Sequence, residues 1–244
     1  MNHTIAFERN YGVRHITVPT GDVVTAISQP DWPSFEQALG ALATDPGRGN
    51  LIMTPELMTS ADVTPDMGTT AITELVGGRI EAAREMTRQL PGSRLLLGSA
   101  MLEPDEPRPY NCVLFLEDGA EVGRTYKASP ANMHEIKGFA LKKVTRQPAR
   151  TVANILCSDI LHLPKVGPGV KTMLVSGCWG VGMQETLSKL PEELHMELLQ
   201  EAAENIFTWR SQVDTIVMAD RVPIGSHFTG PLNFVASRLP SSRR

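Results

Sequence analysis

Hydrophobic positions along the chain follow two patterns: short apolar runs rich in β-branched residues, and longer segments in which apolar residues recur at helical spacing. The apolar runs predict strands at residues 23–28, 50–56, 93–102, 150–157, 171–178, 215–222 and 232–237. The helical spacing predicts helices at residues 34–44, 69–90 and 191–212, with Ser34 as a candidate N-cap of the first. This alternation of strands and helices is typical of an α/β domain.

Residues 110–127 carry a hairpin signal. Two strand-like runs flank Asp118–Gly119, a dipeptide favoured in two-residue turns between antiparallel strands. We therefore expect a mixed sheet. The Gly/Pro-rich stretch at residues 164–169 predicts a loop, because strand patterns continue on both sides of it. Residues 1–244 are expected to form a single domain, in which residues 1–21 are an extension before the first strand.

Composition excludes several classes of protein. The chain has 244 residues, of which 41% are hydrophobic and 20% charged, as expected for a globular protein with a sizeable core. A net charge of -4 without a long basic run argues against a nucleic-acid partner. No apolar run is long enough to span a membrane, and the first residues are too polar for a secretory signal. The three cysteines form no disulfide framework and have no metal-ligand spacing, so we expect a cytoplasmic protein with free thiols and no metal.

Three reactive side chains stand where predicted strands end. Glu56 closes the run at 50–56, Lys127 ends the second strand of the hairpin, and Cys157 ends the run at 150–157. Ligands in α/β folds bind at strand ends, where these groups could serve as a base, a charge stabiliser and a nucleophile. Taken singly, each residue also has a structural explanation, since cysteine is often a buried packing residue and single charged residues usually lie in solvent.

The segments around these residues resemble three ordered blocks of the nitrilase superfamily of carbon–nitrogen hydrolases. "LIMTPEL" resembles the block with the catalytic glutamate, "LLLGSAML" with "YNCVLFLEDGAEVGRTYKAS" resembles the lysine block, and "ANILCSDILHLP" resembles the cysteine block. The resemblance covers about residues 23–236. It implies a four-layer α-β-β-α sandwich with mixed sheets, a homodimer or higher homo-oligomer, and hydrolysis of a small amide or nitrile without metal or organic cofactor.

The resemblance also implies a role for each catalytic residue. Glu56 would take the thiol proton of Cys157, and the thiolate would attack the substrate to form a thioester. Lys127 and the backbone N–H of Ser158 would stabilise the oxyanion. Glu135, in "MHEIKGF", lies where the superfamily has a further glutamate and would orient Lys127 or the substrate.

Other residues near these blocks have less specific signals. Trp179 lies where the superfamily often has a pocket aromatic residue, and His134 and His162 are candidate substrate contacts without metal-ligand spacing. Cys112 alternates with leucines along its strand and is interpreted as a packing residue. Asn111 is expected to fix the entrance of the hairpin rather than to contact substrate.

The sequence departs from the superfamily pattern around the proposed pocket. "CSDILHLP" lacks the arginine and phenylalanine that usually follow the cysteine, and "PKVGPG" replaces the expected helix. These departures leave the substrate and the oligomeric state open. The first hypothesis is a hydrolase, the second an acyltransferase that uses the same thioester, and the third a non-catalytic interaction protein with this fold.

Overall fold

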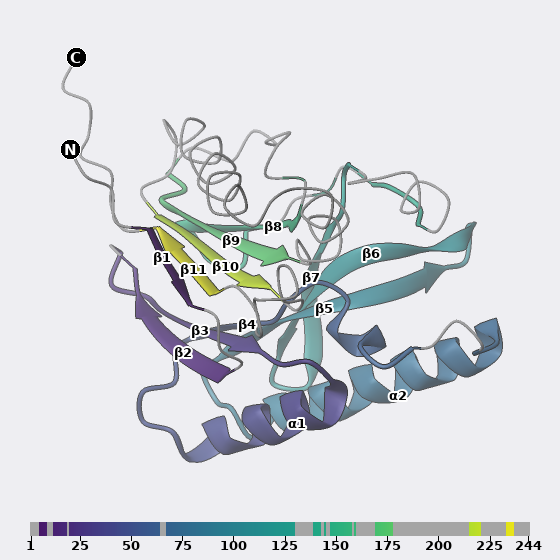
Figure 1. The fold of residues 1–244 in the computed structure, drawn as a ribbon, viewed down its shortest axis with the longest axis horizontal. Helices are drawn as coiled ribbons and strands as arrows, with labels where there is room; N and C mark the ends of the chain where they lie inside the picture. The colour runs from purple at the N-terminus through teal and green to yellow at the C-terminus, as the bar shows by residue number, and fades with distance from the viewer. Residues whose placement is uncertain are drawn as a thin grey trace, which may run out of the picture.

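The computed structural model describes residues 5–8, 12–18, 20–63, 67–129, 139–142, 144, 147–157, 159, 169–177, 215–220 and 233–236. These residues form two β-sheets that pack face to face, with two α-helices against the outer face of the larger sheet (Figure 1). Within the described residues, no helix is both long and apolar enough to cross a membrane.

The larger sheet has six strands in the order β2-β3-β4-β5-β6-β7. They are β2 (Gly12–Thr17), β3 (Val23–Ser28), β4 (Leu51–Met53), β5 (Arg94–Glu103), β6 (Glu106–Glu117) and β7 (Ala120–Tyr126). Strands β3, β4 and β5 are parallel, whereas β2, β6 and β7 pair antiparallel with their neighbours. The predicted mixed sheet is therefore confirmed.

The second sheet has the order β1-β11-β10-β9-β8. Its strands are β1 (Ile5–Glu8), β8 (Val152–Leu156), β9 (Thr172–Gly177), β10 (Thr215–Asp220) and β11 (Asn233–Ala236). Strands β8, β9 and β10 are parallel, and β11 runs antiparallel to both β10 and β1.

Residues 1–21 contain two strands that the hydrophobic pattern did not predict. Strand β1 pairs with β11, and β2 pairs with β3. Both are edge strands, and the side chains of β2 are half-buried or exposed. An edge strand needs no continuous apolar run, so the hydrophobic pattern does not reveal a polar edge strand such as β2. This segment is thus part of both sheets rather than an extension before them.

The helices cover the six-stranded sheet. They are α1 (Trp32–Ala41) and α2 (Thr69–Thr87), with 3₁₀ turns η1 (Leu42–Thr44) and η2 (Met58–Ser60). The N-cap of α1 is Asp31, not the predicted Ser34. The Asp31 side chain accepts a hydrogen bond from the Ser34 backbone N–H at 2.8 Å, and Pro33 occupies the first turn, where its missing N–H is harmless.

The hairpin turn at Asp118–Gly119 is confirmed. Both residues have left-handed backbone angles, with φ of 50° at Asp118 and 78° at Gly119. Two successive positive φ values match the twist of a tight antiparallel hairpin, and aspartate followed by glycine is the pair that tolerates them best. This turn fixes the register that sets the far ends of β6 and β7 side by side.

Two apolar cores follow from the alternation of side chains along the strands. In β4, Ile52 packs toward the helices, whereas Leu51 and Met53 pack toward the second sheet. The described residues therefore form three layers, α-β-β. The helix predicted at residues 191–212, which would supply a fourth layer, lies outside the described residues.

We expect Asp31→Ala to lower the free energy of unfolding by about 1 kcal/mol, because it removes the N-cap of α1. Glu36→Ala, at an exposed position of the same helix, is the matched control and should change stability much less. Urea unfolding measures both. Equal effects of the two substitutions would contradict the capping role.

Candidate active site

The three strand-end residues come from both sheets. Glu56 follows β4, Lys127 follows β7 in the same six-stranded sheet, and Cys157 follows β8 in the second sheet. The Glu56 backbone N–H donates to the Gly177 carbonyl, 3.2 Å away at the end of β9. This hydrogen bond joins the ends of the two sheets at the candidate site.

Glu56 and Lys127 form a buried ion pair. Each is about 1% exposed, and Lys127 Nζ lies 2.7 Å from Glu56 Oε1. Asn111 Nδ2 donates to the same carboxylate oxygen. The Lys127 backbone N–H donates to the Asn111 carbonyl at 2.9 Å, so the β6–β7 hairpin supplies both donors at one level. A buried carboxylate needs such charge-assisted hydrogen bonds to offset its loss of hydration.

Gly98 sets the path of the chain that carries Glu56. A Cβ added to Gly98 would lie 2.0 Å from the Pro55 carbonyl oxygen, so the backbone after β4 passes directly over β5. The Gly98 N–H donates to Thr54 Oγ1 at 2.8 Å. Leu57 has a left-handed φ of 56°, which turns the chain sharply after Glu56. The local sequence thus directs the carboxylate inward.

Cys157 stands at a strained strand end. Its φ is 41°, in the left-handed region that a residue with a Cβ rarely adopts, and it is 4% exposed. Leu156 pairs with Ser176, so Cys157 follows at the level of Gly177, the residue that accepts the Glu56 N–H. A sharp turn directly after a strand is typical of presented nucleophiles.

Cys112 has a different environment. It belongs to the core between the helices and the six-stranded sheet, and burial raises the pKa of its thiol to about 12. A thiol this hard to ionise is inert at neutral pH. The interpretation of Cys112 as a packing residue is confirmed.

Asp159 joins the segment after Cys157 to the segment after Lys127. Its carboxylate accepts hydrogen bonds from the backbone N–H groups of Ala128 and Ser129, at 2.9 and 2.7 Å, and from Ser129 Oγ at 2.6 Å. Burial raises the pKa of Asp159, and these hydrogen bonds, together with the Lys127 charge, oppose that shift.

Asn111 and Asp159 are the two buried polar residues of this region that sequence reasoning missed. Asn111 was expected to fix the hairpin entrance, and it does pair with the Lys127 backbone, but its side chain also contacts Glu56. Asp159 has no signal of its own beyond its place in "ANILCSDILHLP". The sequence places both near predicted site residues: Asn111 lies in β6, the strand paired with the strand that leads to Lys127, and Asp159 follows Cys157 by two residues.

The remaining predicted site residues lie outside the described part of the chain. They are His134, Glu135, Ser158, His162 and Trp179. Of the predicted residues that the structure describes, it brings Glu56 and Lys127 into direct contact and sets Cys157 at a neighbouring strand end. Their catalytic roles stay predictions.

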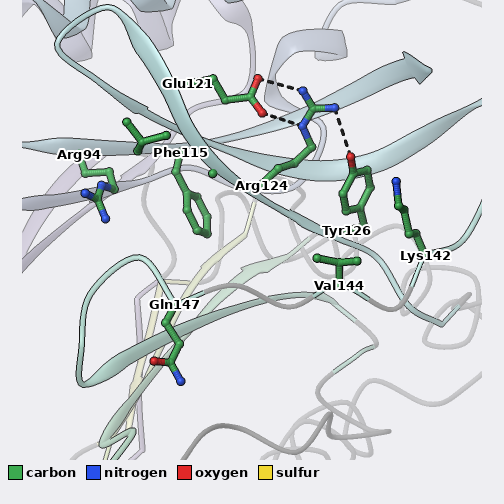
Figure 2. A pocket seen from close by; sticks show the side chains of 10 residues that line it. Arg94, Phe115, Glu121, Arg124, Tyr126, Lys142, Val144 and Gln147 are labelled. Carbon is green, nitrogen blue, oxygen red and sulfur yellow. Dashed lines mark hydrogen bonds and ion pairs between the residues drawn. The ribbon is translucent and has the colours of Figure 1, made fainter. Parts of the chain in front are cut away.

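A separate pocket of about 610 Å³ lies beside β7 (Figure 2). Glu56, Lys127 and Cys157 are not among its described lining residues. Its three cationic side chains are each paired with a carboxylate, in the pairs Arg94–Glu117, Arg124–Glu121 and Lys142–Glu103. Each cation of the pocket lining thus has a carboxylate partner.

Comparisons with known proteins identify the fold. No protein-family model matches the sequence, and no curated protein matches it. Among solved structures, a carbon–nitrogen hydrolase from Helicobacter pylori G27 superposes with a TM-score of 0.64 at 13% identity, over 86% of this chain and 78% of that one. The NitN amidase from Nesterenkonia sp. AN1 gives 0.54 at 14%, over 91% and 96%.

A glutamine-dependent NAD+ synthetase from Acinetobacter baumannii gives a TM-score of 0.54 at 16% identity. The match covers 89% of this chain but only 42% of the synthetase, so the chain spans less than half of that protein. The Nesterenkonia amidase is described as a member of the nitrilase superfamily. The resemblance noted in the sequence is therefore confirmed at the level of the fold.

We expect Gly98→Ala to lower the free energy of unfolding by about 1–3 kcal/mol and to displace Glu56, because its Cβ has no space beside Pro55. Gly77→Ala, at an exposed position in α2 with no atom within 4 Å of the added Cβ, should instead raise stability by up to about 1 kcal/mol. Thermal unfolding of both variants tests this. A Gly98→Ala protein as stable as Gly77→Ala would contradict the close approach.

We expect Lys127→Met to lower the free energy of unfolding by about 3–5 kcal/mol, because it leaves the Glu56 carboxylate buried without its cation. Adding Glu56→Gln should recover part of this loss, because no buried charge then remains in the pair. Urea unfolding of the two single variants and the double variant gives the coupling free energy between Glu56 and Lys127. Lys142→Met, which breaks the partly exposed pair with Glu103, is the control and should have a smaller effect. Strictly additive single effects would contradict the buried pair.

Proposed function

We propose that this protein is a nitrilase-type carbon–nitrogen hydrolase that cleaves an amide or nitrile through a thioester on Cys157. The observation that carries the proposal is the buried Glu56–Lys127 pair. The Glu56 backbone N–H also donates to Gly177, which lies in the second sheet at the level of the strained Cys157. A carboxylate, an ammonium and a thiol at one strand-end edge are the groups that cysteine-dependent amide cleavage requires.

The solved structures support the same chemistry. One structure of a Nesterenkonia amidase variant has the acetamide moiety of fluoroacetamide added covalently at the active-site cysteine. Another amidase variant from that organism is in complex with butyramide. Small aliphatic amides are therefore the first substrates to test with this chain.

The first half-reaction forms the thioester. Glu56 takes the proton of the Cys157 thiol, and the sulfur attacks the carbonyl carbon of the amide. Lys127 Nζ stabilises the negative charge that develops on the carbonyl oxygen, a contribution of about 3 kcal/mol for a well-placed donor. When the C–N bond breaks, Glu56 returns its proton to the departing nitrogen, which leaves as ammonia or an amine.

The second half-reaction releases the acid. Glu56 takes a proton from a water molecule, the hydroxide attacks the thioester carbon, and the C–S bond breaks. The proton then passes to the Cys157 sulfur and restores the thiol. An acyltransferase would follow the same course with an amine or another nucleophile in place of water.

The hydrogen bonds around Glu56 assign its two oxygens to different tasks. Lys127 and Asn111 both donate to Oε1, which holds the carboxylate in one orientation. We assign the proton transfers to Oε2. Asn111 Oδ1 is buried and accepts no hydrogen bond from the described residues, so it is a suitable acceptor for the N–H of an amide substrate.

The charges of the site favour a general-base mechanism. The Lys127 cation is matched by the Glu56 carboxylate, 2.7 Å away. Because Glu56 already neutralises the Lys127 cation, this pair provides no excess positive charge to hold a resting thiolate. Glu56 must therefore remove the thiol proton as the substrate reacts.

We expect fluoroacetamide to label wild-type protein once, at Cys157, as detected by intact-mass and peptide mass spectrometry. Cys157→Ala should abolish the label and lower ammonia release from short aliphatic amides at least ~1000-fold. Glu56→Gln should label slowly, because the thiol loses its base. Cys112→Ala is the matched cysteine control and should label normally, since its thiol lies in the core.

The proposal fails if Cys157→Ala hydrolyses the wild-type substrate at the wild-type rate, or if the label falls on another residue. Adding hydroxylamine during turnover separates the two fates of the thioester. A hydrolase gives mainly the acid, whereas an acyltransferase gives mainly the hydroxamate.

A further inference from the structure

Asp159 lies in the segment that follows Cys157, but its carboxylate contacts the segment that follows Lys127. It follows Cys157 by two residues and is 3% exposed. Its carboxylate accepts three hydrogen bonds of 2.6 to 2.9 Å from Ala128 and Ser129, the two residues after Lys127. One buried side chain thus ties together the segments that leave β7 and β8.

These hydrogen bonds satisfy backbone groups that would otherwise be costly to bury. The N–H groups of Ala128 and Ser129 lie beyond the end of β7, where the sheet pattern no longer pairs them. A carboxylate with two acceptor oxygens satisfies both and also the Ser129 hydroxyl. Oδ1 accepts from the Ser129 N–H and hydroxyl and, at 3.1 Å, from the Ala128 N–H, while Oδ2 accepts from the Ala128 N–H at 2.9 Å, so the negative charge strengthens every one of these hydrogen bonds.

The strained backbone of Cys157 makes such a contact useful. A residue with a Cβ persists at a φ of 41° only when surrounding contacts hold it there. Asp159 contributes to this restraint from two residues further along the chain, because its carboxylate is bonded to Ala128 and Ser129. The anchor lies on the backbone of Lys127's own segment, so the thiol and the ammonium group are positioned relative to one another.

We propose that Asp159 is a positioning residue, whose carboxylate holds the Cys157 turn against the Lys127 turn and so sets where the thiol lies relative to the ammonium group. The inference rests on the proposed function in that Cys157 and Lys127 are the groups being positioned. Asp159 itself forms or breaks no bond in the reaction. Cys157 and Lys127 follow strands of different sheets, and no strand pairing among the described residues fixes their relative position.

Asp159→Asn tests the proposal with little change of shape. The amide can keep an oxygen at the Oδ1 position, but it places an NH₂ group at the Oδ2 position, facing the Ala128 N–H, and it removes the negative charge, so the contact between the two segments weakens. We expect kcat for the amide that the wild type cleaves best to fall ~100-fold, with KM changed less than ~3-fold, because a misplacement of about 1 Å costs that much. Ser129→Ala, which removes one of the three donors, should cause a smaller loss in kcat.

A second readout does not depend on turnover. The rate of Cys157 alkylation by iodoacetamide is measured against pH in four proteins: wild type, Glu56→Gln, Asp159→Asn and the double variant. In the wild-type background, Glu56→Gln should shift the pH dependence of the Cys157 alkylation rate. It should change the profile little in the Asp159→Asn background, because the cysteine is no longer held beside the Glu56–Lys127 pair.

The matched control is Asp62→Asn. Asp62 also accepts a backbone N–H, from Trp32 at 3.3 Å, and an Arg79 donor at 2.5 Å, but it serves the helices rather than the strand ends. This variant should lower stability while leaving kcat and the alkylation profile unchanged. If Asp159→Asn behaves like Asp62→Asn, Asp159 is a structural residue and the proposal is overturned.

The outcomes for Asp159 and for the proposed function are separable. If the wild type cleaves no amide or nitrile, the proposed function fails, and the alkylation comparison alone decides the role of Asp159. If the wild type is active and Asp159→Asn keeps both its kcat and the Glu56 effect on alkylation, the proposal fails and the function stands. If Asp159→Asn does not fold, Ser129→Ala decides through the same two readouts, and wild-type values would overturn the proposal.

Discussion

The buried ion pair between Glu56 and Lys127 is the interaction on which the rest of the site depends. Two opposite charges, each about 1% exposed, are tolerable inside a protein only with short contacts and further hydrogen bonds. Asn111 provides the further donor, and Gly98 gives the chain room to bring Glu56 inward. The β6–β7 hairpin, the crossing over β5 and the pair itself therefore form one structural unit.

The second sheet adds its contribution through backbone contacts. The Glu56 N–H reaches Gly177 at the end of β9, and Asp159 reaches Ala128 and Ser129 beyond β7. Both connections bridge the two sheets at their carboxyl ends, close to the strained Cys157. The apolar core between the sheets holds them together, and these polar contacts determine how the strand ends meet.

Much of the fold could be predicted from the sequence, because buried strands and the Asp118–Gly119 turn have strong local signals. The polar edge strand β2 has no such signal, because its burial depends on pairing with β3. The helical spacing places the start of α1 at Ser34, whereas the helix begins at Trp32 with Pro33 in its first turn and Asp31 as its cap. In the site, strand-end positions pointed to Glu56, Lys127 and Cys157. The contacts of Asn111 and Asp159 depend on segments far apart in the chain, and no local pattern encodes them.

In the proposed mechanism, the ends of β4, β7 and β8 form one catalytic centre. A crystal structure of the fluoroacetamide-treated protein shows whether they do. We expect an acetamide group on Cys157 Sγ, with its oxygen within hydrogen-bond distance of Lys127 Nζ and its nitrogen facing Glu56. An adduct on another residue, or an adduct on Cys157 whose oxygen points away from Lys127, would show that these strand ends do not act together.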